Sequence, residues 1–500
     1  MTKLVCFYSL PRELRDHVYR FYFALEDDYA YNFSTGKLTS ARGGPIDLAL
    51  RSASRTIRDE TRGLALEFNT LHFSSDYDDS LQERAGRFNA LLGIEEHLKT
   101  CYMIRNAARS GCFDDAICAH VERQHPQYMA LIRKLQARRL VNLDSRMWKE
   151  MPSESRKFVT STLAAIAAQP HFSNSTKHTP LWTPKNGGHD PTEVIAHECK
   201  PWELPTDEDI TAMTHLVGPE NRVDASRWTD IRYRDRLKYR FSAATMAIFF
   251  LESTSLDTRL QIRKVVLHEE NKAVAWPECH AQGLIPFCQH NPKLQIERRV
   301  DLWKAILPAA STCLVDYDDV SPAILHQTRC DCVRADLVTA GLHNQGCIAS
   351  WIMEVTALQS HGMPSQSFRL VIDGDLTPTR STHVFDVAQR DAVWQTAFEA
   401  CISDQSIWPT PPEWNKIREN RAYIMHGFPE ALRALTNGQS PVSCNFDIGQ
   451  MPDTEPLIRQ GRMWTLSEWE DNWKALGPAD LDTDVPSRSW LDLQRENMMP

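Results

Sequence analysis

The chain has 500 residues, and two or three domains are expected because single hydrophobic cores stop growing well below that length. Hydrophobic residues make up 42% and charged residues 24%, a composition typical of a folded globular protein. The formal net charge of −9 argues against a nucleic-acid partner, because dedicated nucleic-acid binders usually carry a strongly basic face.

Neither a membrane nor a secretory route is indicated. The longest apolar stretch, residues 243–251, is far shorter than the roughly 20 residues of a membrane-spanning helix. The 13 cysteines are scattered along the chain, a pattern typical of reduced thiols. We therefore expect an intracellular protein, cytoplasmic or nuclear, with no membrane partner and no cofactor.

The first segment, residues 1–75, is predicted to hold two amphipathic helices and a short strand. Leu10, Leu14 and Val18, followed by Phe21 or Tyr22, recur at helical spacing, and Pro11 suits a first helical turn. A second helix is predicted from about residue 48, and Leu71 alternates with Phe73 as in a strand.

Residues 76–168 are predicted to form a helical region, with patterns near 81–100, 125–140 and 154–168. Residues 169–205 contain closely spaced prolines and glycines and are interpreted as a linker or long loop.

Residues 206–435 are predicted to form an α/β body. Strands are expected at residues 262–267 and 294–302 with a helix between them, which makes one βαβ unit, weakly similar to a leucine-rich repeat. The second strand alternates apolar with polar residues, so one face of the sheet is expected to meet water.

A further strand is predicted at residues 368–372, followed by helices at 383–402 and 412–435. The Trp-rich tail, residues 436–500, is expected to wrap back on the body. The fold class predicted from all of these elements is helix-dominated α+β, with N-terminal helices packed on a larger body that holds a small mixed sheet.

Three pieces of the chain resemble a large group of ascomycete F-box-like proteins. The first, Leu10-Pro11-Arg12-Glu13-Leu14-Arg15 with Val18-Tyr19, is similar to that group's LPxELRxxIY opening. The second resembles its "helix then NTxxF strand" segment and comprises Leu50, residues 54–57, Glu60, residues 63–66, Asn69, Thr70 and Phe73. The third, residues 276–288 with 297–300, resembles a block shared by some of these fungal proteins.

This resemblance implies a short helical module to which other proteins bind. Leu10, Pro11, Leu14 and Val18 would then dock a Skp-type adaptor, and the body would bind an unknown protein target. The long insert at residues 26–44 departs from an ordinary F-box. The alternative interpretation is that residues 10–73 are the packed N-terminal cap of a structural or scaffold protein.

An enzymatic alternative rests on Asp373 and Asp375, which follow an apolar strand in an Asp-x-Asp-x-Thr pattern. In haloacid-dehalogenase-type phosphatases the first carboxylate attacks phosphorus and Mg²⁺ bridges the two. That motif normally opens a doubly wound domain, whereas only 123 residues follow Thr377 here. An ordinary turn after a strand is the favoured interpretation.

Two groups of cysteines and histidines have spacings that suggest zinc: His326, Cys330, Cys332, His343 and Cys347, and then Cys279, His280, Cys288 and His290. Both lack a paired Cys-x-x-Cys, and buried thiols with hydrogen-bonded histidines are favoured instead. The sequence therefore predicts a non-enzymatic protein-interaction protein, and the resemblance implies the role of a substrate receptor of a cullin-type ubiquitin ligase.

Overall fold

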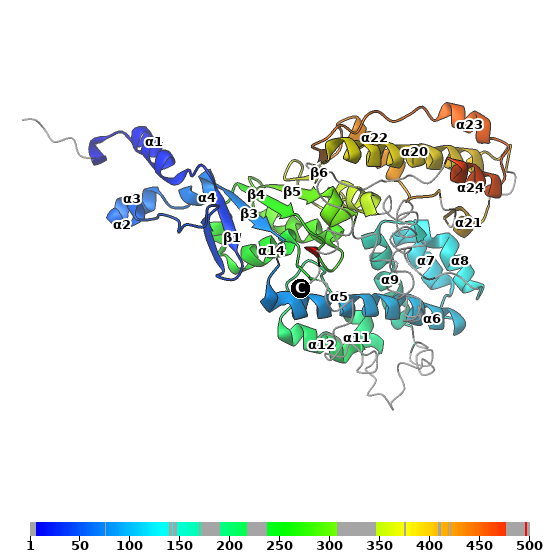
Figure 1. Ribbon diagram of the computed structural model, residues 1–500. Helices are drawn as coiled ribbons and strands as arrows, with labels where there is room; N and C mark the ends of the chain where they lie inside the picture. Colours follow the sequence, from blue (N-terminus) through cyan, green and yellow to red (C-terminus); the bar gives the residue numbers. More distant parts are fainter. Residues whose placement is uncertain are drawn as a thin grey trace, which may run out of the picture.

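The computed structural model describes residues 7–497 except 76, 140–142, 144–147, 170–171, 173–190, 218–237, 308–346, 375–376, 409–411, 419, 421 and 477–495. The fold is α+β and dominated by helices, as the sequence predicts (Figure 1). Its sheet is larger than expected, with seven strands: β1 (Tyr29–Asn32), β2 (Lys37–Ser40), β3 (Thr70–Ser74), β4 (Lys264–Glu269), β5 (Gln295–Asp301), β6 (Phe368–Asp373) and β7 (Val442–Cys444).

The strands lie in the order β2-β1-β3-β4-β5-β6-β7. Only β1 and β2 are antiparallel, so the sheet is mixed with a parallel majority. The β1–β2 hairpin occupies the long insert that separates the two N-terminal helical pieces. That insert therefore extends the sheet by two strands at one edge.

The labelled α-helices are as follows, and residues 347–356 are helical as well: α1 (Arg12–Phe23), α2 (Leu50–Ala53), α3 (Arg55–Glu60), α4 (Leu64–Phe68), α5 (Gln82–His97), α6 (Arg105–Arg109), α7 (Asp115–Gln124), α8 (Met129–Gln136), α9 (Pro152–Ala167), α11 (Pro191–Ala196), α12 (Asp207–Val217), α14 (Ala243–Ser253), α15 (Leu256–Arg259), α16 (Ile285–His290), α20 (Pro378–Ser403), α21 (Trp414–Arg418), α22 (Phe428–Thr436), α23 (Glu455–Gly461) and α24 (Leu466–Ala475).

The two faces of the sheet differ in polarity. On one face the strands bury apolar side chains, including Leu71, Leu267, Ile296 and Leu370, against α5, α12, α14, α16, α20 and α22. The other face carries His72, Lys264, Glu297, Arg369 and Ser443, and most of these side chains are half-buried or exposed. Successive strands from β3 to β7 add in one direction along the sheet.

A buried ion pair lies within the apolar side of the sheet. Arg298 on β5 donates to Glu269 on β4 over 2.9 and 2.7 Å, and both side chains are almost completely buried. Glu269 also accepts the backbone N–H groups of Ala243 and Ala244 at the start of α14. The pair thereby fixes the first turn of α14 against two neighbouring strands.

The later part of the predicted helical region forms a second core beside the sheet, whereas α5 belongs to the main core. Residues of α7, α8 and α9, including Val121, Ile132 and Phe158, are buried together. The two bodies meet where Arg156 of α9 lies 4.4 Å from the ring centre of Trp276. Trp276 and Ala275 both have positive φ angles, a backbone conformation that costs free energy in residues with a side chain.

Within its described residues, the Trp-rich tail contacts the body through α24. Trp469 and Trp473 of α24 are buried against α20, where Trp394 contacts Trp469 edge to face. Residues 169–205, predicted as a linker or long loop, include α11, and most of the rest lie outside the described residues.

Candidate protein-docking surface

The N-terminal helices have a small core of their own. Tyr19 and Phe23 of α1 and Ile57 of α3 are buried together, separately from the main core. We call residues 7–23 with α2, α3 and α4 the hook; it projects from one end of the sheet, beyond β1 (Figure 1). The prediction of a single second helix is wrong, because this part of the chain forms three short helices, α2, α3 and α4. Ser54 and Gly63 interrupt it.

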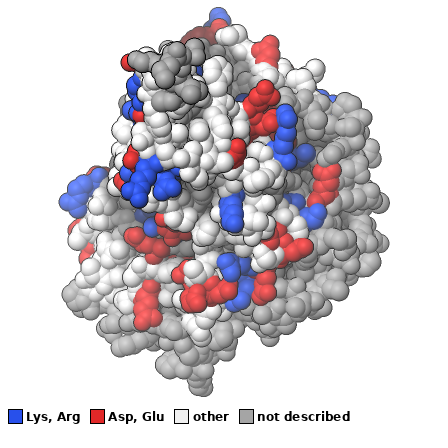
Figure 2. Space-filling model, turned by 90° about the vertical axis from the view of Figure 1, so that its left-hand side faces the viewer, with Lys and Arg blue, Asp and Glu red and all other residues white. Residues whose placement is uncertain are grey.

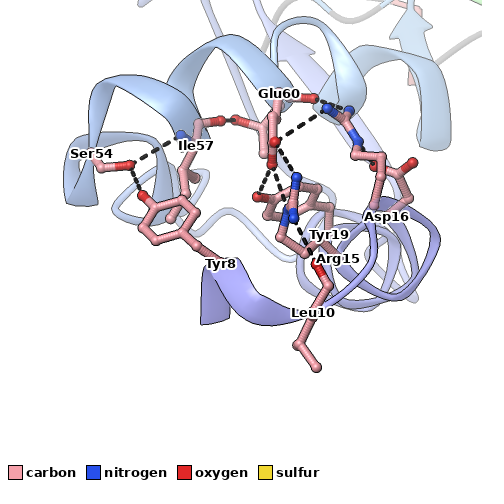
Figure 3. Close-up of polar contacts among 10 residues, drawn as sticks. Tyr8, Leu10, Arg15, Asp16, Tyr19, Ser54, Ile57 and Glu60 are labelled. Atoms are coloured by element: carbon pink, nitrogen blue, oxygen red, sulfur yellow. Dashed lines mark hydrogen bonds and ion pairs between the residues drawn. The ribbon is translucent and has the colours of Figure 1, made fainter. Parts of the chain in front are cut away.

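One carboxylate joins the two halves of the hook (Figure 3). Glu60, at the end of α3, accepts two bonds from the Arg15 guanidinium, at 2.6 and 3.1 Å, and one from the Tyr19 hydroxyl at 2.6 Å. Hydrogen bonds from Arg15 and Tyr19 lower the pKa of Glu60 to about 2, although partial burial opposes this. Burial, with the Glu60 bond second, raises the pKa of Tyr19 to about 12. Glu60 is therefore ionised and Tyr19 neutral at physiological pH.

The chain entering α1 is also tied to α3. The Tyr8 hydroxyl contacts the Ser54 hydroxyl, and Ser54 caps α3 by accepting the Ile57 N–H at 3.1 Å. The Arg15 guanidinium donates to the Leu10 carbonyl over 2.7 Å. These bonds hold residues 8–10 beside α3 as a fixed extension of α1 (Figure 3).

The predicted partner-binding residues lie together on the outside of the hook. Leu14 and Val18 remain 50% and 44% exposed, Pro11 precedes α1 and is exposed, and Leu10 is half-buried. Phe21 extends the same line and is 86% exposed. We call these five residues the apolar stripe.

Two apolar lines run along α1, and the sequence does not separate them. Tyr19, Tyr22 and Phe23 face the hook core, whereas Leu14, Val18 and Phe21 face outward. Of the two residues proposed to continue the predicted stripe, Phe21 is therefore the outward one. In the view onto this end of the molecule, uncharged surface lies between groups of basic and acidic side chains (Figure 2).

The Arg15–Glu60–Tyr19 network is a feature that sequence reasoning missed. All three positions belong to the pieces that resemble F-box-like proteins, and the signal was the position of Arg15 and Tyr19 one helical turn apart on the buried side of α1. Arg15 and Tyr19 of the N-terminal pattern thus hold the hook together. Leu14 and Val18 of the same pattern form its outer surface.

Asp373 of the proposed phosphatase site and His280 of a proposed zinc site form hydrogen bonds within the protein. Asp373 accepts a 2.7 Å bond from Asn445, and Asp375 lies outside the described residues. His280 contacts the Ser242 hydroxyl and the Ala275 carbonyl, and burial, with Arg298 second, lowers its pKa to about 3.

The other proposed zinc group lies mostly beyond the described part of the chain, because His326, Cys330, Cys332 and His343 are outside it. Within the described residues, no group of three or more His, Cys, Asp or Glu side chains is arranged to hold a metal ion. No described helix combines the length and apolarity needed to cross a bilayer.

Comparisons with known proteins leave the hook and the sheet to be interpreted from their own geometry. No protein-family model, curated protein or solved structure matches the chain.

Proposed function

We propose that the protein is a non-enzymatic interaction protein that docks a Skp-type adaptor through the hook, as a substrate receptor of a cullin-type ubiquitin ligase would. The observation that carries the proposal is the outward apolar stripe: Leu14, Val18 and Phe21 are 50%, 44% and 86% exposed on one short helix. An exposed line of large apolar side chains on a rigid element is typical of a protein-binding surface.

The rigidity of the hook supports the same proposal. Docking costs less free energy when side chains are already held in place. The Arg15–Glu60 pair and the Tyr8–Ser54 contact fix α1 relative to α3 while leaving the stripe exposed. In this interpretation the hook is F-box-like, and the body, weakly similar to a leucine-rich repeat in its one-directional strand order, presents its surface to a protein target.

The test is direct binding of the purified full chain to a purified Skp-type adaptor, measured by biolayer interferometry. Leu14→Asp places an unpaired carboxylate in the centre of the apolar stripe, so we expect affinity to fall by about tenfold or more. Leu14 is half exposed, and the substitution should leave the thermal unfolding of the chain nearly unchanged.

The matched control is Met463→Asp, which introduces the same group at a residue that is 82% exposed and lies between α23 and α24. Its adaptor affinity should equal that of the wild type. Equal binding by Leu14→Asp and wild type, or no binding by the wild type, would contradict the proposal.

A further inference from the structure

Beside the apolar stripe, the hook carries an unneutralised row of arginines. Arg51 lies on α2, and Arg55 and Arg58 lie three residues apart on α3, so the last two share one helix face. The Arg58 Nε donates to the Arg51 carbonyl over 3.4 Å, which brings Arg51 to the same place across the break at Ser54. We call Arg51, Arg55 and Arg58 the arginine row.

The row differs from most other arginines of the hook region, Arg20 excepted, in its pairing. Arg12 and Arg15 pair with Glu60, Arg42 with Asp27, and Arg62 with Asp257. Within the described part of the chain, no ion pair involves Arg51, Arg55 or Arg58, and the buried Nε of Arg51 has no hydrogen-bond partner. Asp59 is the exposed carboxylate of α3, so this surface stays net basic on a chain of net charge −9.

The row continues the surface of the stripe. Tyr8 is 47% exposed, and its hydroxyl contacts Ser54, the residue directly before Arg55. Residues 8–10 therefore connect the outer face of α1 to the beginning of α3, as Figure 3 shows for Tyr8, Leu10 and Ser54. A partner that covers Leu10 and Tyr8 therefore comes close to the backbone at Ser54, directly before Arg55.

We propose that the adaptor bound by the hook has an apolar groove with a rim of carboxylates, and that this rim pairs with the arginine row. The inference rests on the proposed function, because the adaptor is its occupant. Charge complementarity carries it: guanidinium groups form strong paired hydrogen bonds with carboxylates, and a basic surface on an acidic protein favours an acidic partner. A protein is favoured over nucleic acid because the row adjoins large apolar side chains and the chain as a whole is acidic.

The test compares adaptor binding at about 50 mM and about 300 mM sodium chloride, since exposed charge pairs weaken as salt shortens their range. The Arg55→Glu/Arg58→Glu variant should bind about tenfold more weakly than wild type at low salt and lose most of the salt dependence. The control is Arg433→Glu/Arg459→Glu, which makes the same charge change at exposed residues of α22 and α23. It should match the wild type.

Circular dichroism melting of each variant separates loss of binding from loss of folding. If wild type binds and Arg55→Glu/Arg58→Glu binds equally well at both salt concentrations, the acidic rim is wrong while adaptor docking stands. If wild type binds no adaptor at either concentration, the proposed function fails and this inference fails with it. Binding of a 20-mer DNA duplex that depends on Arg55 and Arg58, without adaptor binding, would reassign the row to nucleic acid.

Discussion

At the scale of single residues, Glu60 joins α3 to α1 and thereby stabilises the hook. Its carboxylate satisfies Arg15 and Tyr19 together, and Arg12 adds a longer contact of 3.4 Å. Because the folded-state pKa of Glu60, about 2, lies below the ordinary value of 4.5, ionised Glu60 stabilises the folded hook. That stabilisation is complete above pH 4.5 and disappears as the pH falls towards 2.

Glu60→Gln should weaken the hook by about 1–2 kcal/mol at neutral pH, because the negative charge that faces Arg15 is lost and one acceptor oxygen becomes an NH2 donor. Native-state hydrogen exchange of the α1 and α3 amides would measure the change. In the wild type, the protection factors of these amides, which correct for the slower intrinsic exchange in acid, should show an excess fall between pH 4.5 and 2 relative to the rest of the chain, and in Glu60→Gln this excess should vanish. Exposed Glu13→Gln, the control, should behave as the wild type does; an unchanged excess in Glu60→Gln would show that the network contributes nothing.

At the scale of elements, the hook is attached to the body at Gly63. This residue begins α4 with φ +82°, and a Cβ atom added there would lie 2.4 Å from the Gln261 side chain, just after α15. Asn69, at the other end of α4, accepts the Leu25 N–H and donates to the Phe23 carbonyl. Both ends of α4 are therefore fixed, one against the body and one against α1.

Gly63→Ala should destabilise the chain by about 1–2 kcal/mol from backbone strain alone, and by more from the clash with Gln261. Chemical denaturation would measure both parts. Gly36→Ala supplies the strain alone, since Gly36 also has a positive φ and no atom within 4 Å of the added Cβ. Adding Gln261→Ala to Gly63→Ala should restore part of the loss; no restoration would mean that the close approach is unimportant.

Much of the sheet could be predicted from the sequence, because local periodicity marks a strand. The strands expected at 262–267, 294–302 and 368–372 correspond to β4, β5 and β6, and the expected wet face exists. The pairing of β3 with β4 could not be foreseen, because almost 190 residues separate Ser74 from Lys264 and local patterns carry no information on such contacts. The exposure of Leu14 and Val18 was equally hidden, since α1 carries two apolar lines.

At the scale of the whole molecule, stability depends on a charged pair inside an apolar layer. Arg298 and Glu269 are both buried, and Arg298 also lies 4.6 Å from the ring centre of Trp351. Charges removed from water are tolerated only while they remain paired and hydrogen-bonded. The sheet is therefore intolerant of changes to one partner.

Arg298→Met should destabilise the chain by about 3–5 kcal/mol, because Glu269 is left buried without its partner. Thermal unfolding would show this as a lower midpoint, and Glu269→Gln/Arg298→Met should recover part of the loss. Arg299→Met, at the neighbouring but exposed position, is the control and should cost far less. Similar midpoints for the Arg298 and Arg299 variants would contradict this description of the core.

The way the hook joins the sheet has a mechanical consequence. The chain leaves α4 and enters β3, which hydrogen-bonds on both sides, to β1 and to β4 in parallel. A pull on the hook along β3 loads these bonds side by side in shear, so that many must break together. A force applied through the hook would therefore act on a strand that is held from both edges.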